Sequence, residues 1–128
     1  MARKPKALVL DSWSVLAYLE DEPAGPQVAD LIADAHESDT PLMMTVVNAG
    51  EVWYITARET SEDVADRTIL ELAQLGIQFF DADWKLAREA SKFKVKGKMS
   101  FAVLLSLGLG VAMLSGIVVW QLKKKKYF

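Results

Sequence analysis

The 128-residue sequence contains no cysteine. Disulfide frameworks and thiolate metal sites are therefore excluded, and the absence of cysteine suits a reducing cytoplasm. We also expect no secretion, because the first apolar run of the N-terminal segment, ALVL, is far shorter than the apolar region of a secretory signal. We therefore expect a cytoplasmic protein of a size that forms one domain with a single core.

Acidic side chains are absent from residues 91–128, which contain eight lysines and carry a formal charge of +8. Residues 1–90 contain all 17 acidic side chains and seven basic ones, and their formal charge is −10. Such asymmetry often marks a tail that meets an anion, either nucleic acid or lipid. It is equally consistent with a solvated flank around a helix.

Short apolar runs alternate with helical patterns over the first three quarters of the chain. The runs predict strands at residues 7–11, 42–47 and 77–80, and the segments between and after them have apolar residues at helical spacing. Alternating strands and helices are typical of a parallel sheet that is covered on both faces. The lone histidine, His36, falls near the polar end of a predicted helix, where we expect a surface residue.

Two carboxylates follow neighbouring strands of this predicted sheet. Asp11 ends the first strand, and Glu51 comes shortly after the second. Ligands of open parallel sheets bind at the carboxyl ends of the strands, and two carboxylates there suit Mg²⁺ or Mn²⁺. Helix capping is the alternative for both residues: Asp11 is a good N-cap, and Asn48 and Glu51 have the spacing of a capping box.

Three segments carry a resemblance to a known family: ALVLDSWSVLAYLEDEP, MTVVNAGEVWYITARE and FFDADWKLAREASKFKVKGKMSFA. In this order and spacing, over residues 6–102, they resemble PIN-domain ribonucleases, similar to the VapC-like toxins of toxin–antitoxin pairs. The resemblance implies a Rossmann-like α/β/α fold with a parallel sheet, and an Mg²⁺ or Mn²⁺ ion held by acidic residues that cleaves RNA. It also implies an antitoxin protein as partner, and a possible homodimer.

The resemblance assigns Asp11 and Glu51 as the first two acids of the family's site, both catalytic and metal-binding, with Ser12 and Ser14 as small polar residues beside the first acid. The third acid of the family falls at Val103, and no acid follows in the segment that would carry the fourth. We therefore expect an impaired metal-dependent endoribonuclease. We also expect the family's C-terminal strands to be missing or replaced by an apolar helix.

The C-terminal segment has a different character from the preceding domain. We divide the chain into an incomplete PIN-like domain at 1–102 and a segment at 103–128, with a helix predicted at 101–122. Residues 99–122 carry no charge and are long enough to cross a bilayer as a helix. A frameshifted gene is a second explanation, because the loss of one base converts Asp-Ala codons into the Val-Leu found at 103–104.

Two functions from other classes stay open beside the ribonuclease. The acidic domain could be a non-catalytic module that binds an antitoxin. Alternatively, the protein could be membrane-anchored through residues 101–122, with the lysines at 123–126 at the interface.

Overall fold

The computed structural model describes residues 7–96 and 117–120. In chain order these residues form β1 (Ala7–Leu10), α1 (Ser12–Leu19), α2 (Gly25–Glu37), β2 (Leu42–Thr45), α3 (Val46–Glu59), α4 (Glu62–Gln74), β3 (Ile77–Phe80), α5 (Trp84–Lys96) and β4 (Ile117–Trp120).

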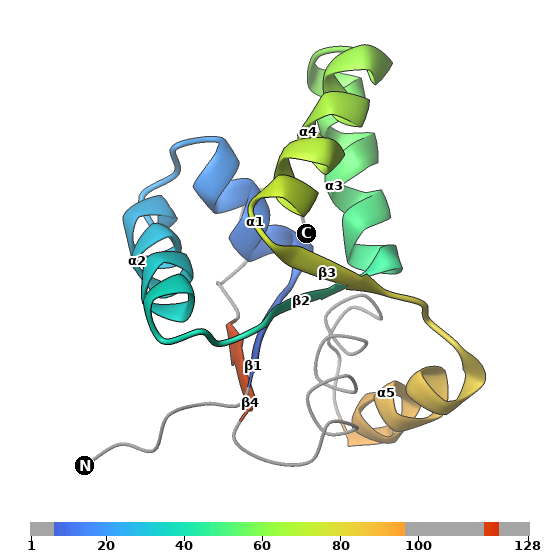
Figure 1. Ribbon diagram of the computed structural model, residues 1–128. Helices are drawn as coiled ribbons and strands as arrows, with labels where there is room; N and C mark the ends of the chain where they lie inside the picture. Colours follow the sequence, from blue (N-terminus) through green and yellow to red (C-terminus); the bar gives the residue numbers. More distant parts are fainter. Residues whose placement is uncertain (1–6, 97–116, 121–128) are drawn as a thin grey trace.

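The four strands form one parallel sheet in the order β3-β2-β1-β4 (Figure 1). All residues of β1 and β2 are buried, as the continuous apolar runs of their sequences predict for strands covered on both faces. The predicted α/β fold with a parallel sheet is confirmed.

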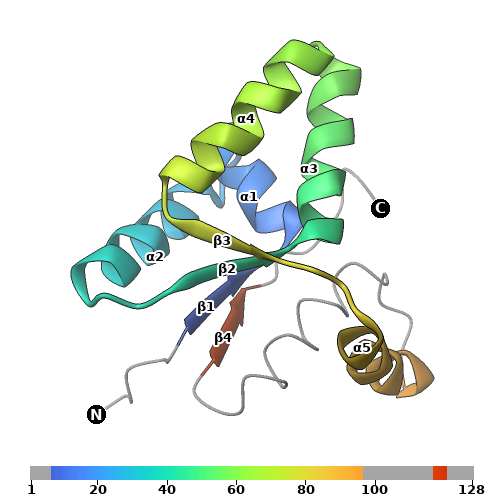
Figure 2. The same cartoon turned by 45° about the vertical axis from the view of Figure 1, so that its right-hand side comes forward.

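Helices cover the two faces of the sheet unequally. The α1 to α4 helices pack on one face, around a core that includes Leu10 and Met44. The α5 helix lies on the other side of the sheet (Figures 1 and 2). Its Leu86 and Ala90 pack there against Val9 and Met43. Alternate residues along β1 and β2 thus belong to separate cores, and the described residues form three layers, α/β/α.

The second strand is shorter than its sequence predicts. The β-branched Val46 and Val47 favour a strand, yet they form the first turn of α3 and are 40% and 38% exposed. Thr45 ends the strand because its side chain caps α3 by accepting a hydrogen bond from the Asn48 backbone amide. A local cap therefore overrides the strand propensity of the two valines.

The fourth strand was not expected from the sequence. Residues 117–120 pair with β1 in parallel register, from Ala7 opposite Ile117 to Leu10 opposite Trp120. The predicted helix at 101–122 is wrong at these four residues, and the expectation that C-terminal strands are missing is corrected by β4. An apolar run with three consecutive β-branched residues, Ile117 to Val119, suits a buried strand as well as a helix, and the length of the surrounding apolar segment concealed this.

The other predictions for the C-terminal segment fall mostly on residues outside the described ranges. Within 7–96 and 117–120, no helix combines the length and apolar character needed to cross a membrane. The division predicted at residue 102 stays a prediction.

Candidate functional site

The carboxyl ends of β1 and β2 lie side by side. The register pairs Val9 with Met43, so that two residues further on Asp11, which directly follows β1, lies level with Thr45, the last residue of β2. Each of the two residues is the N-cap of the helix that follows its strand. The edge of the sheet is thus formed by two strand-to-helix turns, whose helices α1 and α3 start next to each other (Figure 2).

Asp11 is fully buried at this edge. Its Oδ1 accepts a 2.8 Å hydrogen bond from the Ser14 backbone amide, and Ser14 Oγ donates to the Asp11 carbonyl at 2.9 Å. The capping role considered from the sequence is therefore present. It occupies one carboxylate oxygen and fixes the side chain at the start of α1.

Asn48 links the two strand ends. Its Nδ2 donates to Thr45 Oγ1 at 2.7 Å, and its Oδ1 accepts from the Ser12 backbone amide at 3.0 Å. Asn48 is fully buried, so these bonds are shielded from water. One side chain of α3 thereby holds the first residue of α1 beside the end of β2.

Glu51 lies one turn further along α3 and is half-buried. Its Oε1 accepts a 2.6 Å hydrogen bond from Ser12 Oγ. The capping box considered for Asn48 and Glu51 is absent, because α3 begins at Val46 with Thr45 as its cap and Glu51 reaches across to α1 instead. Ser12 follows Asp11 directly in the chain, so it connects the two predicted site residues.

The side chains gathered here offer oxygen donors: carboxylates from Asp11 and Glu51, hydroxyls from Ser12 and Ser14. Hard oxygen donors are the ligands that small divalent cations prefer. In the part of the chain that the structure describes, however, no three His, Cys, Asp or Glu residues come together as a metal-binding group. The donor set fits Mg²⁺ or Mn²⁺ in kind and supplies two of the carboxylates implied by the resemblance.

From the sequence, Asn48 was considered only as the first residue of a capping box with Glu51. The signal that could have revealed its role is the spacing Thr45-x-x-Asn48, in which a cap residue is followed three positions later by a side chain that can return to it. The spacing could not have revealed the second hydrogen bond, to the Ser12 amide, because that bond depends on the register of β1 against β2.

A different hollow, of about 370 Å³, lies at the opposite edge of the sheet, where β2 and β3 begin, and is lined in part by His36, Asp39, Thr40 and Gln78. His36 is exposed, as expected, and its Nε2 lies 2.7 Å from the Leu75 carbonyl oxygen. Ligands of parallel sheets bind at the carboxyl rather than the amino ends of the strands. The edge with Asp11 and Glu51 is therefore the better candidate.

Comparison with solved structures agrees with this architecture. The fold is similar to the crystal structure of Mycobacterium tuberculosis VapC20, described as a toxin that cleaves the sarcin-ricin loop, with a TM-score of 0.62 and 15% identity over 84% of this chain and 83% of that one. At this level of identity the likeness concerns the fold. No match was found among curated proteins.

Comparison with family models identifies the family. The model of the PIN domain matches residues 8–119, which include both strand ends of the candidate site and continue across residue 102 into β4. The match covers most of the chain. The protein therefore belongs to the PIN domain family.

Proposed function

We propose that this protein is a metal-dependent endoribonuclease of the PIN-domain toxin type, with Asp11 and Glu51 as its metal-binding and catalytic residues. The observation that carries the proposal is the connection of the two carboxylates through Ser12, at the carboxyl end of a parallel sheet. The fold likeness to a toxin that cleaves an RNA loop supports RNA as the substrate class.

The site contains two residues that would bind the metal and two residues that position them. Asp11 and Glu51 would hold Mg²⁺ or Mn²⁺, and such an ion supplies an activated water and stabilises charge on the phosphate. Ser12 orients Glu51 by donating to its Oε1, while Asn48 fixes Ser12 through the backbone amide. Supporting bonds of this kind keep ligands in place and raise metal affinity.

The proposal includes impaired activity. Two carboxylates hold a divalent ion weakly, and Val103 can neither bind a metal nor orient a water. We therefore expect little or no RNA cleavage by this chain in Mg²⁺ or Mn²⁺.

Partner and location follow from the same proposal. The segment from Ser12 to Gly76 contains 13 acidic residues and two arginines, so a basic segment of an antitoxin would find an acidic surface on it. The homodimer and the membrane association through residues 101–122 stay predictions, as does a cytoplasmic location.

The test is RNA cleavage by the full chain with Mn²⁺, compared with an Asp11→Asn variant. Asparagine keeps an oxygen that caps α1, so this variant separates the charge of Asp11 from its capping role. We expect whatever cleavage the wild type retains to disappear in Asp11→Asn and in EDTA, and to persist in Asp30→Asn, a variant of an exposed acid on α2. RNA cleavage that is measurable and equal in Asp11→Asn and Asp30→Asn would refute the role of Asp11. Robust wild-type cleavage that is lost in Asp11→Asn would confirm that role and contradict the impairment.

A further inference from the structure

The outward face of α5 carries a tryptophan among basic side chains. Trp84 is 76% exposed, while Leu86 and Ala90 of the same helix are buried against the sheet. At 100° per residue, Trp84, Arg88 and Val95 fall opposite the buried side, with Lys85 and Lys92 beside them. All five are exposed, and we call this set the α5 stripe.

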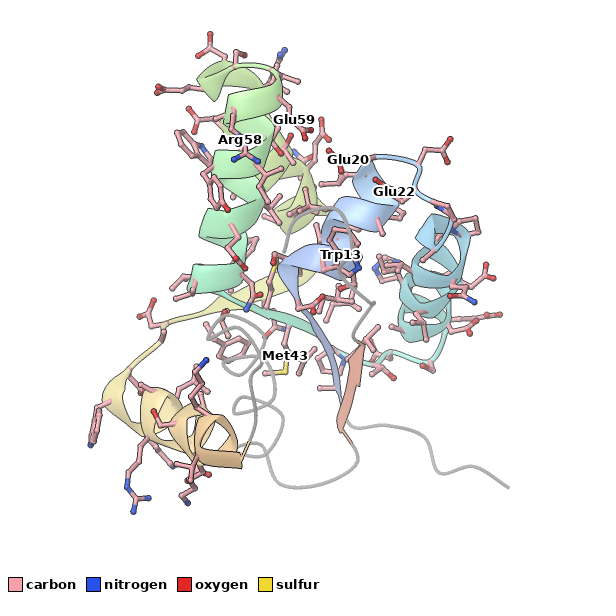
Figure 3. All side chains as sticks on the ribbon, turned by 180° about the vertical axis from the view of Figure 1, so that it is seen from behind. Trp13, Glu20, Glu22, Met43, Arg58 and Glu59 are labelled. Carbon is pink, nitrogen blue, oxygen red and sulfur yellow. The ribbon has the colours of Figure 1, made fainter. Side chains whose placement is uncertain are left out.

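The charge of α5 differs from that of the rest of the described domain. The helix contains five basic residues and one acid, Glu89, which pairs with Lys92 at 3.0 Å. Between residues 7 and 83 the basic residues are Arg58 and Arg67, against 16 acids. Both arginines belong to the α3–α4 hairpin, and Figure 3 shows Arg58 near the end of α3 that is remote from the sheet. Within the described residues, α5 is therefore the concentrated source of positive charge.

The α5 stripe begins close to the candidate site. Phe80 pairs with Thr45, which caps α3 at the site. Trp84 follows Phe80 by four residues, a span of at most about 14 Å along the chain. A strand of nucleic acid that enters the site at the carboxyl edge of the sheet can therefore continue onto α5.

From this arrangement we propose that the α5 stripe binds single-stranded RNA next to the candidate site, with Trp84 stacking on a base and Lys85 and Arg88 contacting phosphates. This rests on RNA being the substrate class of the proposed function. Aromatic side chains among cations are the usual means of binding single strands, because every base has a stacking face and every phosphate a negative charge.

A lipid surface is the other anionic surface that a basic helix with a tryptophan could meet. Helices that lie on membranes insert a broad apolar face between the lipids. In α5 the broad apolar side, with Leu86 and Ala90, is already buried in the core, and the exposed side offers two apolar residues, Trp84 and Val95. The observations therefore favour RNA.

The experiment measures binding of the full chain to a labelled single-stranded RNA by fluorescence anisotropy, in EDTA so that cleavage does not interfere. We expect Trp84→Ala to weaken binding roughly 5- to 100-fold, and Trp84→Phe to retain most of the affinity. A variant with Lys85→Glu and Arg88→Glu should also bind more weakly and show a smaller dependence of affinity on salt. The matched control, Arg58→Glu with Arg67→Glu, should change binding less than twofold.

Failure of this inference is distinguishable from failure of the proposed function. If the Trp84→Ala and charge-reversal variants bound RNA as tightly as the wild type, or if the wild type did not bind RNA, the proposed role of the α5 stripe would be overturned. This holds whatever the result of the cleavage assay. If the α5 variants bound anionic lipid vesicles more weakly than the wild type but bound RNA equally well, the stripe would be a membrane-binding surface and the RNA proposal would be overturned. Weaker RNA binding in the α5 variants of a chain that does not cleave RNA would support the stripe and count against the enzyme. Circular dichroism of each variant verifies that it is folded.

Discussion

Ser12 Oγ lies 2.6 Å from Glu51 Oε1 and donates a hydrogen bond to it across 39 positions of sequence. Ser12 is the first residue of α1 and Glu51 lies in the second turn of α3, so the bond joins the two helices that start at the carboxyl ends of β1 and β2. Because Ser12 directly follows Asp11, this bond sets the place of one carboxylate relative to the other.

Removing that bond should weaken metal binding without unfolding the chain. We predict that Ser12→Ala lowers the affinity for Mn²⁺ by about 10- to 100-fold, the usual effect of losing a supporting bond to a metal ligand. Isothermal titration calorimetry measures it. Ser91→Ala is the matched control, since Ser91 Oγ bonds to the Ala87 carbonyl on exposed α5 and should leave the affinity unchanged. Equal affinities in the two variants would contradict the role given to Ser12.

Asn48 should matter for stability. Asn48→Ala removes the side-chain bonds to Thr45 Oγ1 and to the Ser12 amide in a fully buried place. Thr45 Oγ1 keeps its bond from the backbone amide of residue 48, but the Ser12 amide loses its side-chain acceptor. We predict a decrease of about 1 to 3 kcal/mol in the free energy of unfolding. Urea denaturation measures this, and Gln27→Ala, on the exposed side of α2, is expected to change it by less than about 0.5 kcal/mol. A loss at Asn48 no larger than at Gln27 would show that the link between the strand ends is energetically unimportant.

Two glycines should respond oppositely to alanine. A Cβ at Gly25 would lie 2.8 Å from the Ala17 carbonyl oxygen, so α1 and α2 would have to move apart. At Gly50, inside α3, a Cβ meets nothing within 4 Å. We predict that Gly25→Ala destabilises by about 1 to 3 kcal/mol and that Gly50→Ala stabilises by about 0.5 to 1 kcal/mol. Thermal denaturation compares them, and the same sign for both would contradict the packing described.

The sequence was most informative where a local pattern and the topology rule act together. The apolar runs at β1, β2 and β3 were found because buried parallel strands are continuously apolar, and the rule for the carboxyl ends then placed Asp11 and Glu51 at one edge. The structure has both residues at that edge. That they bind a metal stays a prediction.

Patterns that depend on distant parts of the chain were not predicted. The Ser12–Glu51 bond and the Asn48–Ser12 bond require the register of β1 against β2, which the residues around them do not specify. Ile117–Trp120 was taken for helix because a long apolar run has no periodicity that distinguishes helix from buried strand. Its partner, β1, is more than a hundred residues away.

Restoring an acid at position 103 tests the expected impairment. We predict that Val103→Asp raises Mn²⁺-dependent RNA cleavage, though to only a fraction of the rate of a complete PIN site, because the fourth acid is still absent. Val103→Asn is the control, since it adds a polar side chain of similar size without charge. No gain from the aspartate, or an equal gain from the asparagine, would contradict the explanation by missing charge.

The central claim is that Asp11 and Glu51 hold one divalent ion together. Its most direct test is a titration with Mn²⁺ followed by electron paramagnetic resonance, on the wild type, Asp11→Asn, Glu51→Gln and the double variant. When two residues bind the same ion, the effects of their substitutions on the affinity do not add. We predict one weak site in the wild type, its loss in each single variant, and no further loss in the double variant. Retention of wild-type affinity in both single variants would show that Asp11 and Glu51 do not form a metal site.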